Sequence, residues 1–372
     1  MIKVLHFFKT SLPSTMGGVE QVIDQLCRGT KQYNIDSSVL ALTNSSVFRP
    51  YSEYNGYKLH LVKSDLKIAA TDFSLSAFHK FSQLAKQVDI IHYHFPWPFM
   101  DLVHFATRIK KPTLITYHSD IVRQKNLMVL YKPLMNAFLN DVDRIIVTSP
   151  NYLESSEVLK KFENKTTIIP IGIAKSSYPL PNLERISYWK NLFRSDFFLF
   201  IGVLRYYKGI HVLLEASVDT EIPVVIVGNG PLREKLECEA KRLGLKNVYF
   251  VGAIPDEDKV ALLYLCFGIV FPSHLRSEAF GISLLEGAMY GKPMISCEIG
   301  TGTSFINKNN ITGLVIPPDN SVALKNAMFE LWSNPLSAKQ LGMNAEEHFN
   351  RNFTSDEMNE NYSKIYHTLY RK

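Results

Sequence analysis

Two carboxylates, Glu278 and Glu286, stand with seven residues between them where an apolar stretch leads into a predicted helix. The apolar residues 267–271 predict a buried parallel strand, and Gly291 and Pro293 would end the helix that follows. Glu278 therefore falls in a strand-to-helix loop, at the sheet edge where open α/β folds bind ligands. Glu286 has mostly apolar neighbours three and four residues away, so its carboxylate needs hydrogen-bond donors. Ligand hydroxyls would supply such donors.

Both glutamates also have a structural interpretation. Glu278 would then complement the dipole at the helix N-terminus, and Glu286 would be a surface charge beside the apolar face. The residues between them favour a ligand, because a helix that starts at Gly281, Ile282 and Ser283 presents free N–H groups. Such a helix start is a natural binding site for a diphosphate.

Two cations occur where another strand of the same half ends. Arg205 and Lys208 follow the predicted strand 197–201 and precede a helix. Fixed cations at this position would stabilise the negative charge of a bound phosphate without a metal ion. The alternative is that both are solvated surface cations. Gly228 and Gly230 follow the next strand, where they would let a ligand approach the backbone closely.

The first half contains a similar junction. Gly17, Gly18 and Glu20 lie after the first predicted strand and open a helix, so the glycine pair could receive a phosphate, although such a pair is commonly a plain turn. His118 ends a later strand, where its imidazole could hydrogen-bond a ligand hydroxyl or stabilise developing charge. Asp120 could orient this histidine. The alternative is a structural histidine that is satisfied within the core.

Aromatic side chains end the strand before His118. His94 and Trp97 occur there, and aromatic faces suit a sugar or a lipid. We therefore consider both residues as contacts of an acceptor, although core packing explains them equally well.

These motifs together resemble the retaining GT-B glycosyltransferases of family 4. The matching segments are Glu278 to Glu286 with Gly291-Lys292-Pro293 (E-x7-E), Gly17-Gly18-Val19-Glu20 (G-G-x-E), Lys208-Gly209, and Gly228-Asn229-Gly230-Pro231 (G-x-G-P). The resemblance covers nearly the whole chain. It departs at Val203, where the family usually carries an arginine, and Arg205 stands two residues later.

The resemblance implies transfer of a sugar from a nucleotide-sugar donor to an acceptor hydroxyl, with retention of configuration and with no metal or other cofactor. The implied catalytic residues are His118, Glu278, Lys208 and Arg205. The implied donor-binding residues are Gly17, Gly18, Gly228, Gly230, Gly281, Ile282, Ser283 and Glu286, with Glu286 on the ribose hydroxyls. The acceptor residues that we consider are Glu20, His94, Trp97 and Asp120.

The expected donor and acceptor come from a finer resemblance. Residues 300–306 resemble bacterial polysaccharide mannosyltransferases of this family, which implies GDP-mannose as donor and a growing, lipid-diphosphate-linked surface glycan such as O-antigen as acceptor. Residues 1–190 contain 23 Lys and Arg against 15 Asp and Glu, and this excess favours an anionic membrane surface or a phosphorylated acceptor. Residues 121–132 mix cations with apolar residues and are a candidate membrane contact, or an ordinary amphipathic helix. No nucleic-acid-binding motif accompanies the charge.

Other functions remain as alternatives. Non-hydrolysing nucleotide-sugar 2-epimerases share the two-domain fold and would convert their substrate without an acceptor. A non-catalytic sugar-nucleotide binding protein is a second alternative. A dehydrogenase is disfavoured because no G-x-G-x-x-G follows the first strand. A periplasmic binding protein is disfavoured because the first residues lack the pattern of a signal peptide, and we expect a cytoplasmic protein, peripheral at the inner membrane.

The elements that would position these residues form an α/β fold. Its 372 residues are too many for one ordinary core, and a composition of 46% hydrophobic and 20% charged residues is that of a globular protein. Strands are predicted at 2–8, 38–42, 57–62, 90–94, 113–117, 145–148 and 167–171, and then at 197–201, 224–227, 248–251, 269–271, 294–297 and 313–316. Strands separated by helices predict parallel, doubly wound sheets.

We therefore expect a GT-B arrangement of two facing Rossmann-like domains, residues 1–174 and 190–354, with a turn-rich linker at 176–182. The resemblance implies that a final helix, within 355–372, returns to the first domain. Two acidic pairs imitate metal motifs: Asp141 and Asp143 precede a strand, and Asp256 and Asp258 begin a helix. Helix or strand ends suit such acids, so neither pair predicts a metal site. Four scattered cysteines predict neither a zinc site nor a disulfide framework.

Overall fold

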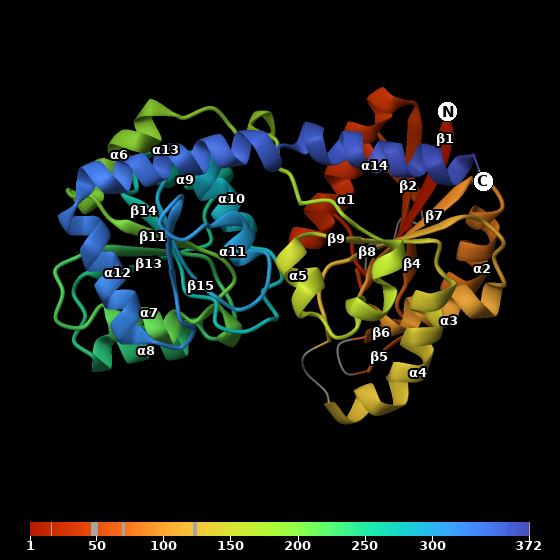
Figure 1. Ribbon diagram of the computed structural model, residues 1–372, viewed down its shortest axis with the longest axis horizontal. Helices are drawn as coiled ribbons and strands as arrows, with labels where there is room; N and C mark the ends of the chain where they lie inside the picture. Colours follow the sequence, from red (N-terminus) through yellow and green to blue (C-terminus); the bar gives the residue numbers. More distant parts are fainter. Residues whose placement is uncertain (16, 46–50, 69–70, 122–124, 372) are drawn as a thin grey trace. The chain divides into compact units, whose positions relative to one another are not determined.

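The computed structural model describes residues 1–15, 17–45, 51–68, 71–121 and 125–371. Its contacts divide the chain into two compact units, residues 1–172 with 355–372, and residues 173–354. Each unit is built on a mainly parallel sheet with helices on both sides (Figure 1). None of the helices within the described ranges is long and apolar enough to cross a membrane.

The first unit contains an eight-stranded sheet in the order β10-β9-β8-β7-β1-β2-β4-β3. Its strands are β1 (Ile2–Phe7), β2 (Ile35–Thr43), β3 (Tyr51–Tyr54), β4 (Tyr57–Lys63), β7 (Ile90–Phe95), β8 (Thr113–Tyr117), β9 (Arg144–Val147) and β10 (Thr166–Ile168). Its helices are α1 (Gly18–Gly29), α2 (Leu75–Ala85), α3 (Pro98–Thr107), α4 (Lys125–Asp141), α5 (Pro150–Ser155) and α14 (Ser355–Tyr370), with the 3₁₀ helices η1 (Thr30–Tyr33) and η2 (Leu159–Lys165). The strand order reverses between β1 and β7, so ligands are expected at the carboxyl ends of these two strands.

The second unit contains a six-stranded parallel sheet in the order β13-β12-β11-β14-β15-β16. Its strands are β11 (Phe198–Ile201), β12 (Val224–Val227), β13 (Val248–Gly252), β14 (Gly268–Phe271), β15 (Met294–Cys297) and β16 (Gly313–Ile316). Its helices are α6 (Leu183–Phe193), α7 (Ile210–Ala216), α8 (Arg233–Arg242), α9 (Asp256–Leu265), α10 (Ile282–Met289), α11 (Thr303–Ile306), α12 (Ser321–Ser333) and α13 (Pro335–Asn352), with η3 (Lys175–Ser177) and η4 (Tyr206–Lys208). The reversal lies between β11 and β14.

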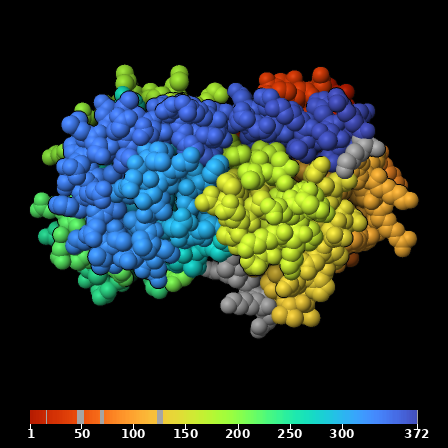
Figure 2. Space-filling view, viewed as in Figure 1, coloured from red at the N-terminus to blue at the C-terminus, as the bar shows by residue number. Residues whose placement is uncertain are grey.

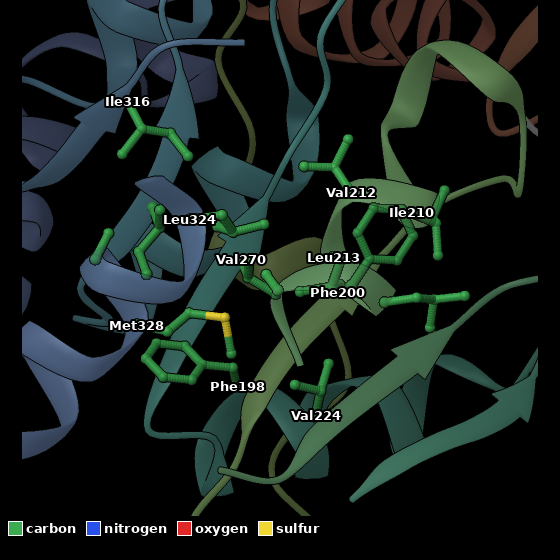
Figure 3. Packing of buried hydrophobic residues seen from close by; sticks show 14 of the residues in the cluster. Phe198, Phe200, Ile210, Val212, Leu213, Val224, Val270, Ile316, Leu324 and Met328 are labelled. Atoms are coloured by element: carbon green, nitrogen blue, oxygen red, sulfur yellow. The ribbon is translucent and has the colours of Figure 1, made fainter. Parts of the chain in front are cut away.

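Burial of both sheet faces holds the central strands of the second unit in place. Phe198 and Phe200 of β11 point to one face, where they belong to one cluster with Leu213 of α7 and with Leu324 and Met328 of α12 (Figure 3). Leu199, on the other face of the strand, is also fully buried. Alternate side chains of a strand point to opposite faces, and a strand covered on both faces is apolar throughout. The end of β11, from which the loop with Lys208 begins, is therefore held in place by the core.

The chain returns to the first unit at its C-terminal end. Helix α14 contacts α1, β1 and β7, and the space-filling view shows this last segment, in dark blue, on the surface of the first unit (Figure 2). Tyr362, Tyr366 and Leu369 of α14 are buried, and Ile365 is half-buried. The return of this helix to the first domain was implied by the family resemblance.

Three details differ from the sequence-based expectation. The antiparallel edge strand β3 and the two-stranded sheet of β5 (Leu66–Ile68) and β6 (Thr71–Phe73) were not predicted. Residues 175–189, which were left between the domains, belong to the second unit and include most of α6. Trp189 fastens α6, because it is buried and its indole N–H donates to Asp258 at 2.8 Å.

Candidate active site

The second unit places a buried ion pair at the reversal of its strand order. Lys208 follows β11 and Glu278 follows β14, the neighbouring strand, and the lysine Nζ forms an ion pair with Oε2 of the glutamate. The Ser273 hydroxyl donates to the same carboxylate oxygen at 3.0 Å. Lys208 Nζ also lies 4.7 Å from the ring centroid of Phe271, a cation–π distance. These contacts hold an ammonium group and a carboxylate together at the ligand-binding edge.

Backbone geometry at Gly209 allows the lysine loop to lie against the glutamate loop. Gly209 has φ +69°, and a Cβ built on it would stand 2.0 Å from the carbonyl oxygen of Pro272. The two loops are also joined by a hydrogen bond from the His274 N–H to the Tyr207 carbonyl, at 3.0 Å. A side chain at residue 209 would force these loops apart, which explains the Lys-Gly pair.

The glycines of the neighbouring turn serve the same purpose. Gly228 has φ +130°, and an added Cβ would stand 1.9 Å from the carbonyl oxygen of Gly202. A Cβ on Gly230 would stand 2.6 Å from the backbone of Leu204. The Leu204 N–H donates to the Asn229 carbonyl at 3.0 Å. The two glycine-containing segments therefore pack backbone against backbone beside the lysine loop.

Helix α10 begins directly after the Glu278 loop. Gly281 precedes it with φ +105°, a conformation that suits glycine. Ile282 is the first residue of the helix and half-buried, and Ser283 is buried. The first N–H groups of any helix lack partners within it, so this end of α10 can receive an anion.

Glu286 lies in the same helix but has its own set of partners. Its side chain is 6% exposed, and Oε1 accepts from the Tyr178 hydroxyl at 2.9 Å and pairs with Lys259 Nζ at 3.1 Å. Burial opposes the charge of Lys259, but Glu286 and Asp256 outweigh burial and raise the lysine pKa. Burial and then Glu286 raise the pKa of Tyr178. The donors that the sequence analysis required for Glu286 are therefore partly supplied by the protein itself.

Arg205 does not join the ion pair. It is exposed and precedes η4, and its guanidinium makes no hydrogen bond or ion pair within the described part of the chain. Val203 is 46% exposed. Leu204, between them, is fully buried, so the segment is anchored and Arg205 extends toward solvent.

In the first unit, Glu20 closes the loop that contains the glycine pair. Its Oε1 accepts from the hydroxyls of Thr10 at 2.7 Å and Thr15 at 3.2 Å. A Cβ on Gly17 would stand 2.4 Å from its Oε2. Gly18 is the first residue of α1. Glu20 is thus held in the first turn of α1 by the loop after β1.

Three histidines form a chain across three adjacent strands. His118 Nε2 lies 3.0 Å from His94 Nδ1, and His94 Nε2 lies 3.0 Å from His6 Nδ1. His6 is in β1, His94 is in β7, and His118 directly follows β8. Each contact needs one N–H and one lone pair, so the tautomer of each histidine fixes that of the next. His94 therefore orients His118.

A fourth histidine connects this chain to α14. His92 is stacked on His94, and its ring nitrogens lie 2.7 Å from the Tyr366 hydroxyl and 2.7 Å from the Thr116 hydroxyl. Burial lowers the pKa of His6 and of His118 to about 3. Burial also lowers the pKa of His92 and His94, and the neighbouring histidines add to this effect. The whole cluster is therefore neutral at pH 7.

The structure corrects several expectations for the first unit. His94 and Trp97 are 0% and 1% exposed, so neither side chain is available to an acceptor. Trp97 donates its indole N–H to the Asp72 carbonyl at 3.2 Å. Asp120 accepts from the Tyr117 and Ser156 hydroxyls, each at 2.8 Å, and the observed partner of His118 is His94. Residues 122–124 of the expected membrane contact lie outside the described residues.

The acidic pairs have partners within the protein. Asp141 contacts His104 at 2.8 Å, and Asp143 accepts from the Thr113 N–H at 2.9 Å. Asp256 pairs with Lys259 at 2.8 Å. Sequence reasoning did not single out Tyr178, Lys259 or His6, because no spacing motif contains them. The occurrence of histidines in both β1 and β7 was the one available signal for His6.

Comparison with known proteins identifies relatives of both halves. Residues 189–348 match the Glycosyl transferases group 1 family, and residues 16–176 match the Glycosyltransferase Family 4. The chain is 54% identical to the D-rhamnosyltransferase WbpZ of Pseudomonas aeruginosa, over 95% of this chain and 93% of the relative. It is 48% identical to the O-antigen chain mannosyltransferase C of Escherichia coli, over 99% of each chain.

Solved structures share the fold. The sucrose-phosphate synthase of Thermosynechococcus elongatus superposes with a TM-score of 0.83 at 21% identity and covers 100% of both chains. HepE of Anabaena, solved with UDP-glucose, superposes with a TM-score of 0.78 at 17% identity, over 99% of this chain and 100% of that one.

Proposed function

Because the chain belongs to the family 4 glycosyltransferases and has the GT-B fold, we propose that it transfers a sugar of D-manno configuration from a GDP-sugar to a growing O-antigen polysaccharide, with retention of configuration. Two relatives support the configuration of the sugar. One is named for D-rhamnose and the other for mannose, and D-rhamnose is mannose without the hydroxyl at C6. The expected donor is GDP-mannose or its 6-deoxy analogue.

The observation that carries the proposal is the buried pair of Lys208 and Glu278 at the strand-order reversal of the second unit. A nucleotide-sugar presents a diphosphate beside a hydroxylated ring, and the pair presents a cation beside a hydrogen-bond acceptor. In the proposed complex Lys208 binds the diphosphate and Glu278 accepts hydrogen bonds from sugar hydroxyls. The first N–H groups of α10, from Ile282 and Ser283, bind the same diphosphate.

Glu286 and Arg205 have secondary roles in this proposal. Glu286 is held by Tyr178 and Lys259, which fixes the carboxylate for the ribose hydroxyls. Arg205 is exposed and free to turn toward the diphosphate. No metal ion has a role in this scheme, because Lys208 and the N–H groups of α10 neutralise the leaving group.

His118 acts as a neutral hydrogen-bonding group in the proposed mechanism. Its pKa of about 3, lowered by burial, excludes a role as an imidazolium cation at neutral pH. Its Nε2 is engaged by His94, so Nδ1 remains for the sugar or for charge that develops at the anomeric carbon. The leaving phosphate takes the proton of the acceptor hydroxyl on the same face, so retention needs no separate protein base.

A donor screen tests the proposed function directly. The protein is mixed with GDP-mannose, GDP-6-deoxymannose, UDP-glucose and ADP-glucose, and the melting temperature and sugar transfer to an O-antigen fragment are measured. We expect stabilisation and transfer with the guanosine donors, and an α-linked product from an α-linked donor. Stabilisation by uridine or adenosine donors alone, inversion, or conversion of the donor without an acceptor would contradict the proposal.

Two variants test the site. Lys208→Ala and Glu286→Ala should each abolish transfer while circular dichroism stays native. Arg242→Ala is the matched control, because Arg242 is an exposed cation of the same unit whose partner Glu239 lies in its own helix. Near-normal turnover in either site variant would overturn the assignment.

The acceptor is proposed to be lipid-linked, with the protein peripheral at the membrane. Helix α4 supports this, because Val129 and Leu130 are 73% and 79% exposed and Lys132 beside them is exposed. Apolar side chains next to cations suit an anionic lipid surface. Val129→Asp/Leu130→Asp should reduce cosedimentation with phosphatidylglycerol vesicles, and Leu336→Asp, at an exposed leucine of the other unit, should not. Equal vesicle binding by the wild type, the double variant and Leu336→Asp would contradict the membrane role.

A further inference from the structure

Three metal-ligating side chains of the second unit converge outside the ion pair of the proposed active site. They are His211, His274 and Asp319, and one ligand atom of each lies within 4.8 Å of the others. His211 Nε2 stands 3.5 Å from Asp319 Oδ1. Donor atoms around a tetrahedral Zn²⁺ ion with bonds of about 2.0–2.1 Å stand about 3.4 Å apart. The histidine and the carboxylate already have this separation.

His274 supplies the independent sign of a missing ligand. It is 7% exposed, and neither ring nitrogen has a hydrogen-bond partner within the part of the chain that the structure describes. A buried imidazole without partners is costly, because one nitrogen carries a proton and the other a lone pair that water would otherwise satisfy. Coordination of a metal ion by one nitrogen removes part of this cost.

The rings around His274 are also held in position. Tyr206 stacks on His211 with an interplanar angle of 5° and meets His274 edge-on, at centroid distances of 5.3 and 4.9 Å. The backbone N–H of His274 is bonded to Tyr207. Asp319 is exposed, with 66% of its side chain accessible, so it can move the short distance that coordination requires. Two histidines are thus oriented and the carboxylate is free to adjust.

A second histidine group of the molecule does not have these properties. His6, His92 and His94 are also close enough to share an ion, but hydrogen bonds occupy both ring nitrogens of His92 and of His94. A metal ion would have to break these contacts in a fully buried site. The group around His274 keeps its nitrogens available.

We propose that His211, His274 and Asp319 bind one Zn²⁺ ion, with water in the remaining coordination position. Two imidazoles and one carboxylate suit Zn²⁺, whereas Mg²⁺ and Ca²⁺ prefer sites made of oxygen atoms alone. The ligands come from the start of α7, the loop after β14 and the loop after β16. The ion therefore joins three segments of the second unit, and two of them flank Lys208 and Glu278. Its role is structural, and sugar transfer has no step at the ion.

Metal binding is measured on the full-length protein after dialysis against a chelator. Zn²⁺ is titrated in competition with a chromophoric chelator, and Co²⁺ is used as a spectroscopic probe. We expect one equivalent of Zn²⁺, visible absorption bands of tetrahedral Co²⁺, and a melting temperature that rises with Zn²⁺ but not with Mg²⁺. Loss of an outer partner of a ligand typically weakens metal binding about 10- to 100-fold, so loss of a ligand should weaken it at least about 100-fold.

The variants are chosen so that folding does not confuse the result. His211→Ala and Asp319→Asn change half-exposed and exposed side chains, and both should bind Zn²⁺ at least 100-fold more weakly than the wild type with native circular dichroism. His79→Ala removes an exposed histidine of the other unit and should leave the affinity unchanged. If the wild type binds Zn²⁺ no more tightly than His211→Ala, the ion is adventitious and the proposal is wrong, whatever the outcome of the donor screen.

Discussion

A lysine and a glutamate that are both buried stabilise a protein only as a pair. Lys208 and Glu278 are each 9% exposed, so removal of one leaves an uncompensated charge away from water. Sequence reasoning could place each of them at the end of a strand in the same domain, because each follows an apolar strand and precedes a helix. It could not predict their pairing, since the order of strands in a sheet is not written in the spacing of residues.

The pair makes a prediction about stability that is separate from activity. Lys208→Met should lower the free energy of unfolding by about 3–5 kcal/mol, because it leaves Glu278 charged and unpaired. Adding Glu278→Gln should recover much of this loss, because the buried charge is then gone. Both proteins should be inactive in transfer. Urea unfolding of the two single variants and the double variant gives the coupling, and strictly additive losses would show that the two side chains do not interact.

For Glu286, the sequence predicted the environment of the side chain but not its partners. Its apolar helical neighbours correctly predicted a buried carboxylate in need of donors. Lys259 supplies a donor from α9, and Tyr178 supplies one from the segment before α6. No local pattern links these positions to residue 286. Long-range partners of this kind depend on the packing of helices, which the sequence alone does not specify.

At the scale of elements, the turn at Gly228 was predicted from its glycines, and the structure adds the reason for them. An alanine in a left-handed backbone conformation usually costs about 1 kcal/mol. Gly228→Ala should destabilise the protein by more than this, because the added Cβ would collide with the Gly202 carbonyl. Gly244→Ala is the control, since Gly244 also has positive φ, +70°, but open space around its Cβ position. Thermal unfolding of both variants gives the difference, which contains the collision and the larger backbone strain of an alanine at φ +130°. Equal losses would refute a tight contact at Gly228.

The histidine chain predicts a pH dependence of stability. Burial lowers the folded-state pKa of His6 and His118 to about 3, whereas the unfolded value is 6.5. The unfolded chain therefore binds more protons below pH 6.5, and stability that is fully present above 6.5 is lost as the pH falls toward 3. Each such histidine contributes a slope of roughly 1.4 kcal/mol per pH unit in this window.

The variant His6→Phe tests that slope. Urea unfolding between pH 4.5 and 7.5 should show, below about pH 6, a pH dependence that is roughly 1.4 kcal/mol per unit shallower than that of the wild type, because one proton fewer is taken up on unfolding. Carboxyl groups titrate in both proteins and cancel from the difference. His79→Gln, at an exposed histidine, should keep the wild-type slope. A His6→Phe slope equal to that of the wild type would mean that His6 is charged in the folded protein.

For the molecule as a whole, the alternation of apolar strands and helices was enough to predict two doubly wound sheets. All strands that bury both faces were anticipated within a few residues, because such strands are continuous apolar runs. The elements that were not anticipated lack this signal. Strand β3 carries the polar Ser52 and Glu53 at a sheet edge, and β5 and β6 are three residues long. Their pairing is set by neighbours and not by their own composition.

Helix α14 completes the first unit. Within the described chain, its segment is the only part of that unit that comes from beyond residue 172. Its Tyr366 bonds His92 and its Tyr362 bonds Thr116, at 2.7 and 2.8 Å, across more than 240 residues of sequence. Tyr366→Phe should cost about 1–3 kcal/mol, because a buried ring nitrogen of His92 loses its partner. Tyr370→Phe, at a residue that is 56% exposed, should cost almost nothing.

Removal of residues 355–372 extends this argument to the whole unit. The truncated chain would expose the apolar surface that α14 covers on α1, β1 and β7, whereas the unit of residues 173–354 keeps all of its elements. We therefore expect hydrogen exchange to become fast in β1 and β7 but to stay slow in β11 and β14. If β1 and β7 keep their protection from exchange, α14 is not needed for the stability of the first unit. If both units lose protection together, the folding of the second unit depends on the first, contrary to the division of contacts in the structure.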